Sequence, residues 1–233
     1  MRINKYLARC GVGSRRQCDE YIKNRKIKIN GSIIDDFSYS VKDTDCVQYK
    51  GKNLNFVVED YIYILNKPKG YICTSDDPKG RKKVIDLIPV NIRLFNIGRL
   101  DCNTTGIILF TNNGDLANRL LHPSNQVKKK YYVESKEKIN KIDIDNIRKG
   151  LFIPDFGKVK AAITLLESNK NSFIWDIILK EGKNREIRRI FSHLNNKLKK
   201  IHRYEFAGIK LGNIKSGKYK KISYKEFNKF ASI

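Results

Sequence analysis

The apolar positions at the start of the chain recur with the period of an α-helix. Ile3, Tyr6 and Leu7 would lie on one face of such a helix, and Cys10 would extend that face. The glycine-rich sequence at 11–13 then ends the helix. The chain is therefore predicted to begin with a short helix and a turn.

A second helix is predicted directly after this turn. Ser14 suits an N-cap, and Gln17, three residues later, suits the reciprocal partner of a capping box. Cys18, Tyr21 and Ile22 follow at helical spacing. These three residues would form the apolar face of the second helix.

The pattern then changes to the alternation of a β-strand. Ile27 and Ile29 alternate with lysines, and Ile33-Ile34 begin a second strand. Between them, Asn30-Gly31 tolerates the positive φ angles of a two-residue hairpin turn. We expect a hairpin here.

Beyond a polar stretch at residues 50–60, apolar runs and helical patterns alternate irregularly. Strands are expected at 61–65, 94–97, 107–110, 131–133, 159–166, 173–179 and 199–206, and helices at 84–88, 115–121 and 185–191. Because crossover helices do not separate the strands regularly, a mixed or mainly antiparallel sheet is favoured over a doubly wound one. We predict an α+β protein with domains at 1–60 and 61–233.

The charge of the chain narrows the choice of partner. Its 233 residues include 48 Lys and Arg against 24 Asp and Glu, a formal net charge of +24. Such an excess predicts a polyanionic partner, and nucleic acid fits best. No apolar run reaches the roughly 20 residues of a membrane span, and no signal peptide is visible, so a soluble cytoplasmic protein without a membrane partner is expected.

The residues that most often bind metals or close disulfides are scattered. The five cysteines form no C-x-x-C pair and have no histidine at ligand spacing. This pattern predicts reduced thiols, no disulfide framework and no metal site. No phosphate-binding loop or dinucleotide fingerprint is present either, so no cofactor is expected.

Residues 2–31, with the sequence Val-Lys-Asp-Thr-Asp at 41–45 downstream, resemble the S4 domain. In that family, paired helices present basic side chains to structured RNA. The resemblance implies RNA contacts from Arg9, Arg15 and Arg16, which flank the turn between the two predicted helices. The alternative is that these three arginines are merely solvated.

The densest group of chemically useful residues is Gly-Arg-Leu-Asp-Cys-Asn-Thr-Thr-Gly at 98–106. Asp101 lies between a glycine and a Thr-Thr-Gly turn, directly before an apolar strand. Such a position holds a carboxylate on rigid backbone, facing a ligand. In the alternative, an Asx-turn, the side chain only caps its own loop. The residue types in the loop are compatible with both interpretations of Asp101.

The whole string closely resembles the catalytic motif of the pseudouridine synthases that modify single uridines in ribosomal RNA. Supporting matches follow in the same order at 66–70, 129–133 and 181–189. With the S4-like segment in front, the resemblance covers nearly the entire chain. It implies an isomerase that converts a specific rRNA uridine to pseudouridine without a cofactor.

The resemblance also implies roles for individual residues. Asp101 matches the catalytic aspartate that acts at the glycosidic bond, either by covalent attack or by removing a ribose proton. Tyr131 matches a tyrosine that stacks on uracil and relays the C5 proton; its phenol, with a reference pKa of about 10, would need a nearby cation or water. Tyr132 should point to the other face of the strand. Arg188, rather than its neighbour Arg189, matches the arginine that pairs with the carboxylate.

RNA contacts are implied elsewhere in the motifs. A stacked uridine must be flipped out before the aspartate can reach it, and Arg99 matches the residue that fills the gap or holds the flipped nucleotide. Lys67, Lys183 and Arg185 are candidate phosphate contacts. The alternative is that each of them is a plain surface cation.

Two details refine the resemblance. The sequences at 103–106 and 116–124 are more similar to the large-subunit rRNA enzymes than to the small-subunit ones, which remain the alternative. The substrate would be free large-subunit rRNA or an assembly intermediate, and nothing requires more than a monomer. Glu186 departs from the common pattern and would weaken the pairing of Arg188 with Asp101.

Two other functions remain open. A non-catalytic RNA-binding protein of ribosome assembly would need only the S4-like domain. A hydrolase acting through Asp101 would need a second carboxylate to activate water. Asp115 is the nearest candidate in sequence, but it stands where a helix N-cap is expected.

Overall fold

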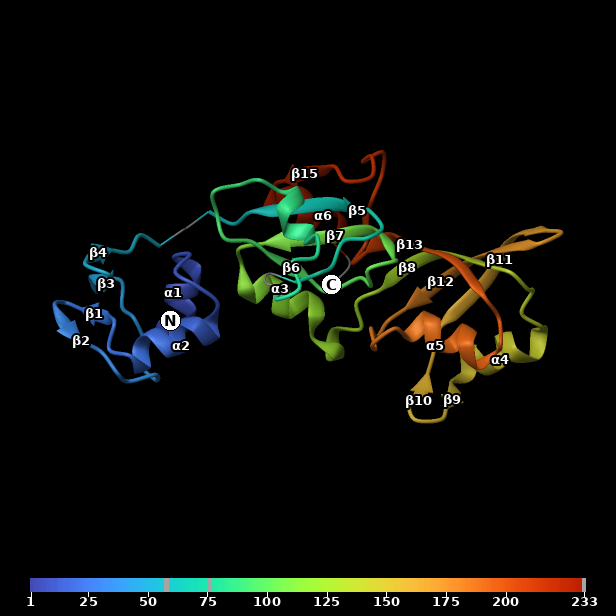
Figure 1. Ribbon diagram of the computed structural model, residues 1–233, viewed down its shortest axis with the longest axis horizontal. Coiled ribbons are helices and arrows are strands. Elements are labelled where there is room, and N and C mark those ends of the chain that lie inside the picture. The colour runs from blue at the N-terminus through green and yellow to red at the C-terminus, as the bar shows by residue number, and fades with distance from the viewer. Residues whose placement is uncertain (57–58, 75–76, 232–233) are drawn as a thin grey trace. The chain divides into compact units, whose positions relative to one another are not determined.

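The computed structural model describes residues 1–56, 59–74 and 77–231. The chain divides into two compact units (Figure 1). The first consists of Met1–Asp60 and Val90–Arg93, and the second of Tyr61–Pro89 and Leu94–Ile233. The short segment Val90–Arg93 thus groups with the first unit, whereas the sequence placed it in the second domain.

The first unit opens with the two predicted helices, α1 (Ile3–Arg9) and α2 (Arg15–Lys23). The predicted capping box is present: Ser14 Oγ accepts from the Gln17 backbone N–H at 3.2 Å, and Gln17 Oε1 accepts from the Ser14 N–H at 2.8 Å. Reciprocal bonds of this kind satisfy N–H groups that a helix start leaves free. The local sequence therefore determines where α2 begins.

A small antiparallel sheet completes this unit. Its strands are β1 (Ile27–Ile29), β2 (Ser32–Ile33), β3 (Val47–Tyr49) and β4 (Lys52–Asn53), in the order β2-β1-β3-β4. The expected hairpin turn is confirmed, with φ of 50° at Asn30 and 85° at Gly31. β4 lies in the polar stretch that the sequence left without a strand. Apolar side chains of α1, α2, β1 and β3 share one core.

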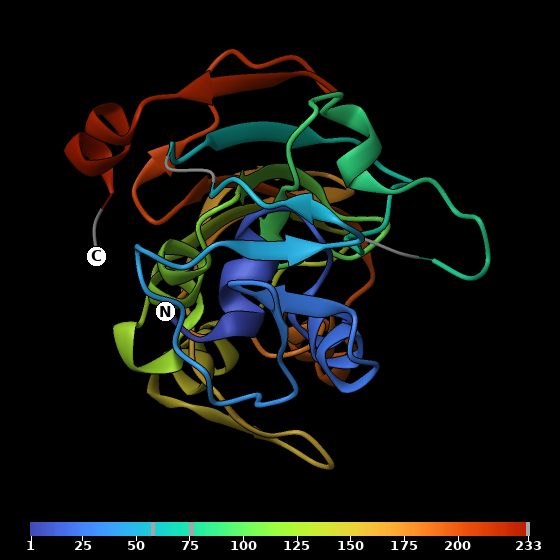
Figure 2. The same cartoon turned by 90° about the vertical axis from the view of Figure 1, so that its left-hand side faces the viewer.

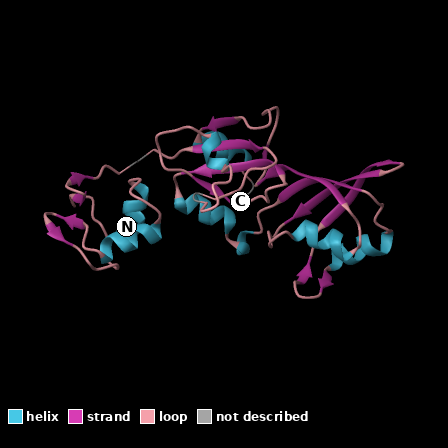
Figure 3. Ribbon diagram, in the orientation of Figure 1, coloured by secondary structure: helices cyan, strands magenta, loops and turns pink. Residues whose placement is uncertain are grey.

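The second unit is built on a large sheet, in which the described residues form nine strands (Figure 3). Its main path is β11-β12-β8-β13-β7-β5-β15; β14 pairs with β13 and β6 with β7. The bounds are β5 Ile62–Lys67, β6 Phe95–Ile97, β7 Thr105–Thr111, β8 Lys129–Ser135, β11 Ala162–Asn169, β12 Ser172–Leu179, β13 Leu198–Phe206, β14 Ile209–Lys210 and β15 Tyr219–Ile222. Figure 2 shows β15 alongside β5.

Only the pairing of β13 with β7 is parallel among the described strands of this sheet. The predicted α+β fold with a mixed, mainly antiparallel sheet is confirmed. Helices are α3 (Gly114–Leu121), α4 (Lys141–Lys149), α5 (Glu186–His193) and α6 (Tyr224–Phe230), with 3-10 turns at Val84–Leu87 and Pro123–Asn125. No helix in the described ranges is long and apolar enough to cross a membrane.

Several elements differ from the sequence prediction, which contained no strand at β14 or β15 and no helix at α4 or α6. The expected strand at 159–166 is divided, because Val159 ends strand β10 (Gly157–Val159) of a separate hairpin with β9 (Leu151–Ile153), and β11 starts at Ala162. Helix α4 was not predicted. Of its residues only Ile147 is buried, and Ile142 is 73% exposed, so its amphipathic pattern is weak.

The start of α3 is also different from the prediction. Asp115 is not the N-cap; Asn113 is, and its side-chain oxygen accepts from the N–H groups of Asp115 at 2.9 Å and Leu116 at 3.1 Å. Asp115 lies in the first turn, where a carboxylate interacts favourably with the helix dipole.

The parallel pairing of β7 with β13 requires a glycine at position 106. Gly106 has φ of +109°, and a Cβ atom there would lie 2.1 Å from the Arg203 carbonyl oxygen. Since a real Cβ cannot approach that closely, the last residue of the Thr-Thr-Gly sequence allows β13 to lie directly beside β7. This contact places the loop that carries Asp101 next to β13.

Candidate active site

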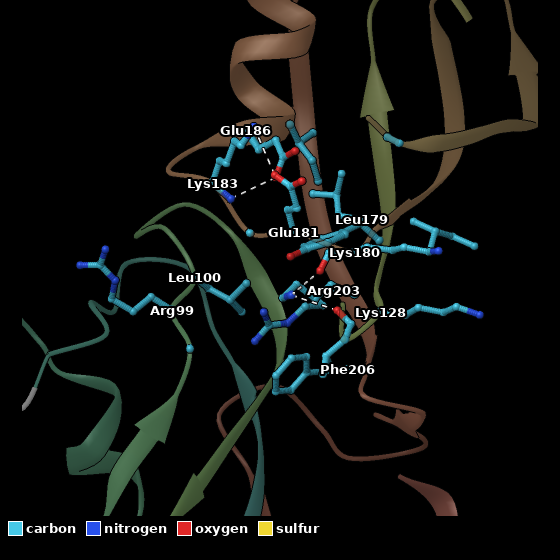
Figure 4. A pocket seen from close by; sticks show the side chains of 18 of the residues that line it. Arg99, Leu100, Lys128, Leu179, Lys180, Glu181, Lys183, Glu186, Arg203 and Phe206 are labelled. Atoms are coloured by element: carbon cyan, nitrogen blue, oxygen red, sulfur yellow. Dashed lines mark hydrogen bonds and ion pairs between the residues drawn. The ribbon is translucent and has the colours of Figure 1, made fainter. Parts of the chain in front are cut away.

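A pocket of about 980 Å³ opens on the second unit (Figure 4). It is lined by the loop before β7, by β8 and β13, by the end of β12 and by the turn into α5. The pocket brings together most of the second-unit residues that the sequence singled out: Arg99, Asp101, Tyr131, Lys183, Arg185 and Arg188. These residues come from segments up to 89 positions apart in the chain, between Arg99 and Arg188.

Asp101 forms an ion pair with Arg188. The Arg188 Nε donates to Asp101 Oδ2 at 3.0 Å, and the two side chains are 23% and 29% exposed. The Arg188 guanidinium also reaches Thr104 Oγ1 at 3.5 Å. Within the described residues no hydrogen bond from its own loop reaches the Asp101 carboxylate. The carboxylate is therefore held by Arg188 and is not the acceptor of an Asx-turn.

The loop around Asp101 is braced by the segment that follows β5. The Lys67 ammonium donates to the carbonyl oxygens of Pro68 at 3.1 Å, Cys102 at 3.1 Å and Thr104 at 2.9 Å. The Gly70 N–H also donates to the Cys102 carbonyl, at 2.9 Å. The 66–70 sequence thus holds both sides of the turn that presents Asp101.

These contacts overturn the expectation that Lys67 binds phosphate. The side chain is fully buried, and its three N–H donors face three carbonyl oxygens. Burial lowers the pKa of its ammonium group. The sequence prediction failed because a lysine next to Pro-Lys-Gly is usually a surface cation, and only the tertiary structure shows that the loop carrying Asp101 covers it.

Arg188 and Arg189 have different partners, although they are adjacent on α5. The Arg189 guanidinium lies over the Phe156 ring, 4.4 Å from its centroid. Successive helical residues point about 100° apart, so only one of the two arginines can face Asp101. The structure places Arg188 there.

The expected interference from Glu186 is not observed. Glu186 is 4% exposed, and its Oε2 accepts from the Lys183 backbone N–H at 3.1 Å. Burial raises the pKa of this carboxyl group. Its side chain closes the turn before α5, and Arg188 remains paired with Asp101.

Tyr131 and Tyr132 point to opposite faces of β8, as predicted. Tyr131 is 8% exposed and lines the pocket. Tyr132 is 43% exposed and stacks on Tyr204, with 4.1 Å between ring centroids. The alternation of a strand explains the difference, and it leaves Tyr131 as the tyrosine on the Asp101 side of the sheet.

The other second-unit cations that the sequence singled out also line the pocket: Arg99, Lys183 and Arg185. Arg99 and Arg185 are exposed, and Arg185 has φ of 55° immediately before α5. Figure 4 shows Arg99 pointing away from Arg203 and Phe206. Lys183 pairs with Glu181 at 3.2 Å and donates to the Lys158 carbonyl.

The three arginines of the first unit differ from one another. Arg9 pairs with Asp60 and lies 5.2 Å from the centre of the Phe56 ring. Arg15 and Arg16, at the start of α2, are exposed. Of the three, Arg15 and Arg16 present their charge most openly.

Two pocket residues were missed in the sequence analysis. Lys129 Nζ donates to the carbonyl oxygens of Val127 at 2.9 Å and Lys180 at 3.3 Å, and burial, followed by the charge of Arg203, lowers the pKa of its amine to about 8. Arg203 lies in the wall of the pocket. Lys129 belongs to the matched motif at 129–133, but it lies in a run of three lysines, which usually indicates an exposed charged segment. Arg203 had no local signal.

No metal site is visible in the described parts of the chain, which contain no cluster of three or more His, Cys, Asp and Glu side chains placed to hold an ion. His122 bonds to Ser124, and His202 bonds to Thr105. All five cysteines lie in the described ranges and are free thiols.

Comparison with known proteins decides the family. Residues 61–193, more than half of the chain, match the family model of RNA pseudouridylate synthases, and residues 1–47 match the S4 domain. The chain belongs to the RNA pseudouridylate synthase family. It is an RNA pseudouridine synthase with an N-terminal S4 domain, and RNA is its partner.

Full-length relatives of this synthase carry related names. The chain is 38% identical to an uncharacterized RNA pseudouridine synthase of Borreliella burgdorferi, over 99% of this chain and 93% of the relative. It is 36% identical to ribosomal large subunit pseudouridine synthase B of Buchnera aphidicola and 32% identical to the protein of that name in Bacillus subtilis. Both matches cover 100% of this chain and 96% of the relative.

A solved structure shares the fold of the synthase. A crystal structure of a pseudouridylate synthase superposes with a TM-score of 0.69 at 24% identity, covering 99% of this chain and all of the other. At this identity the likeness supports the arrangement of helices and strands.

Proposed function

We propose that this synthase isomerises one uridine of large-subunit ribosomal RNA, with Asp101, Tyr131 and Arg188 at the reacting nucleotide. The observation that carries the proposal is the ion pair of Arg188 Nε with Asp101 Oδ2 at 3.0 Å, in the pocket that Tyr131 lines. The choice of large-subunit RNA rests on the names of the relatives from Buchnera and Bacillus.

The reaction requires a carboxylate and a route for one proton. The N1–C1′ bond of uridine breaks, a C5–C1′ bond forms, C5 loses its hydrogen and N1 gains one, so the change is redox neutral. Asp101 acts at the glycosidic bond, and Arg188 orients its carboxylate through the ion pair. Tyr131 stacks against the base and takes part in moving the C5 proton.

Access to the ribose requires that the uridine leave its stack. A pocket of about 980 Å³ is large enough for a flipped nucleotide. Arg99, exposed at the pocket edge, holds the flipped nucleotide or fills its place. Lys183 and Arg185 contact phosphates on either side, and their charges position the RNA without reading its sequence.

The S4 domain binds RNA outside the pocket. Arg15 and Arg16 are exposed at the start of α2 and supply charge for phosphate contacts. Arg9, paired with Asp60 and stacked on Phe56, supports this surface.

Pseudouridine mapping of rRNA tests the proposal. Cells lacking the synthase and cells carrying Asp101→Asn should both lose one large-subunit site, while cells carrying Asp115→Asn, a matched change on α3, should keep it. Loss of a small-subunit site instead would overturn the choice of RNA. An unchanged map, with a ribosome-assembly defect in the deletion strain that Asp101→Asn repairs, would replace the catalytic role by RNA binding alone.

A further inference from the structure

The wall of the pocket contains a buried cation that has no counterion among the described residues. Arg203, on β13, is 2% exposed and lines the pocket. Its Nε donates to the Ile107 carbonyl at 2.8 Å, and its guanidinium lies 4.8 Å from the centre of the Phe206 ring. Figure 4 shows the side chain beside Phe206.

One terminal nitrogen of this guanidinium is unsatisfied. The Arg203 NH2 atom is buried and has no hydrogen-bond partner within the described residues, and no carboxylate in those residues forms an ion pair with Arg203. Burying a charged donor without an acceptor is costly. Arg203 also lines the pocket, so a ligand that binds there and draws the guanidinium toward it would supply the missing acceptor.

The position of Arg203 relates it to both proposed catalytic segments. Arg203 is directly opposite Tyr131 in the antiparallel pairing of β13 with β8, so their side chains share one face of the sheet. In the parallel pairing it is the partner of Gly106, which follows the Asp101 loop. A group that reaches Tyr131 is therefore within the neighbourhood of the Arg203 guanidinium.

The depth of Arg203 indicates which part of the RNA it meets. The exposed cations Arg99 and Arg185 line the pocket edge, where the charged backbone of the RNA would lie. Arg203 is almost completely buried, so a base that enters the pocket would meet it rather than the RNA backbone outside. The acceptors of uracil are its two carbonyl oxygens, O2 and O4.

We propose that Arg203 donates a hydrogen bond to a carbonyl oxygen of the flipped uracil and stabilises the charge that develops on the base during isomerisation. This inference rests on the proposed function. When N1–C1′ breaks, the bonding electron pair stays with the uracil and spreads onto O2 and O4. The base then rotates, C5 joins C1′, and the C5 proton leaves as N1 regains one. A fixed cation aimed at the oxygen where charge develops lowers the barrier.

A functional-group cycle tests the contact. The RNA is a fragment in which wild-type enzyme forms pseudouridine, made with uridine, 2-thiouridine or 4-thiouridine at the target. Sulfur is a weak acceptor, so one thio substitution should slow the wild-type single-turnover rate about 10-fold. Arg203→Met should slow the uridine reaction about 100-fold, and the same thio substitution should then have little further effect.

Two controls distinguish the loss of a contact between Arg203 and the uracil from a general loss of activity or folding. Lys183→Met, which changes a pocket-edge cation, should slow the reaction but retain the full thio effect. Thermal unfolding verifies that Arg203→Met is folded; if it is not, Arg203→Lys takes its place, and the thio effect should shrink in that variant.

The outcomes distinguish the two proposals. Equal thio effects in wild type and in the Arg203 variant, for both analogues, would overturn the contact, as would a wild-type rate in that variant. If the wild-type enzyme forms no pseudouridine in rRNA, the proposed function itself fails, before any Arg203 variant is made.

Discussion

Arg188 and Arg189 show how one position along a helix separates two roles. Arg188 binds the Asp101 carboxylate, whereas Arg189 stacks on Phe156 of the β9–β10 hairpin. Both side chains carry the same charge. Their difference lies only in direction, about 100° apart around α5.

Replacing each arginine by glutamine should separate catalysis from surface charge. Arg188→Gln removes the group that orients Asp101, and the single-turnover rate of pseudouridine formation should fall about 100-fold. Arg189→Gln should change that rate by less than about 3-fold. Arg188→Lys should restore part of the rate, because it returns a charge but not the Nε donor. Equal losses in the two glutamine variants would contradict the assignment.

The lowered pKa of Lys129 predicts that RNA binding depends on pH. Burial and the neighbouring charge of Arg203 lower the pKa of its amine to about 8, so Lys129 is charged below pH 8 and becomes neutral as the pH rises through that value. A neutral pocket residue attracts RNA less strongly. Wild-type affinity for the RNA should therefore decrease above pH 8. Lys129→Arg should move the decrease to higher pH, since a guanidinium keeps its proton there.

A pH titration of RNA binding, followed by fluorescence anisotropy, checks this prediction. Lys129→Met should bind more weakly at pH 7 and lack the step near pH 8. The same step in Lys129→Arg would mean that another group titrates.

At the scale of elements, the Asp101 loop depends on the contact of β7 with β13 and on Lys67. Gly106 permits the close approach of the Arg203 backbone, and the Lys67 ammonium holds the carbonyl groups of Cys102 and Thr104. Neither residue touches the Asp101 carboxylate in the described structure. Both fix the backbone from which it projects.

Alanine substitutions at two glycines measure how much the stability of the fold depends on the close contact between Gly106 and the Arg203 backbone. Gly106→Ala should lower the free energy of unfolding by about 3 kcal/mol or more, because its Cβ would meet the Arg203 carbonyl at 2.1 Å. Gly157→Ala is the matched control: its φ is also positive, at +88°, but no atom lies within 4 Å of the added Cβ. It should cost only about 1–2 kcal/mol, from the backbone conformation.

Urea unfolding followed by Trp175 fluorescence makes this comparison. Trp175 is the single tryptophan of the chain and is fully buried in β12, so its signal reports the second unit. A similar decrease in the free energy of unfolding for the two alanine variants would show that the positive φ angle explains the glycine at 106. The close contact with the Arg203 backbone would then not be the reason.

At the scale of the whole molecule, the formal charge of +24 favours interaction with the polyanionic RNA. Phosphate contacts release counterions, so affinity decreases with salt in proportion to their number. Arg15 and Arg16 are exposed on the S4 domain. Arg15 and Arg16 belong to the first unit and the pocket residues to the second. Substitutions at the two arginines can therefore change RNA affinity without changing the residues at the reacting uridine.

Removing these two charges should weaken binding without slowing the chemical step. Arg15→Ala and Arg16→Ala should each reduce the slope of log affinity against log salt by about 1, while the single-turnover rate at saturating enzyme stays unchanged. Arg25→Ala is a control in the same unit, since Arg25 is already 3.8 Å from the Asp35 carboxylate, and it should change the slope less. An unchanged slope in all three variants would remove the S4 arginines from the RNA contact.

Much of the local structure follows from short segments of sequence. The capping box at Ser14 and Gln17 and the Asn30-Gly31 turn depend on neighbouring residues only, and both were predicted correctly. The pairing of Asp101 with Arg188 was also anticipated, but through a resemblance to known motifs. Local patterns place neither residue near the other, because 86 residues separate them in the chain.

The sequence by itself determined the α+β class, the positions of most helices and strands, the positive charge and the motif around Asp101, because these depend on periodicity, composition and adjacent residues. Only the tertiary structure decided that Lys67 is a buried brace, that Arg188 and not Arg189 faces the carboxylate, and that Arg203 is buried in the pocket wall with one terminal nitrogen unbonded within the described residues. The physical reason is that burial and hydrogen-bond partners are set by distant strands. The same lysine or arginine is a solvated surface cation or a buried donor according to what the fold places over it.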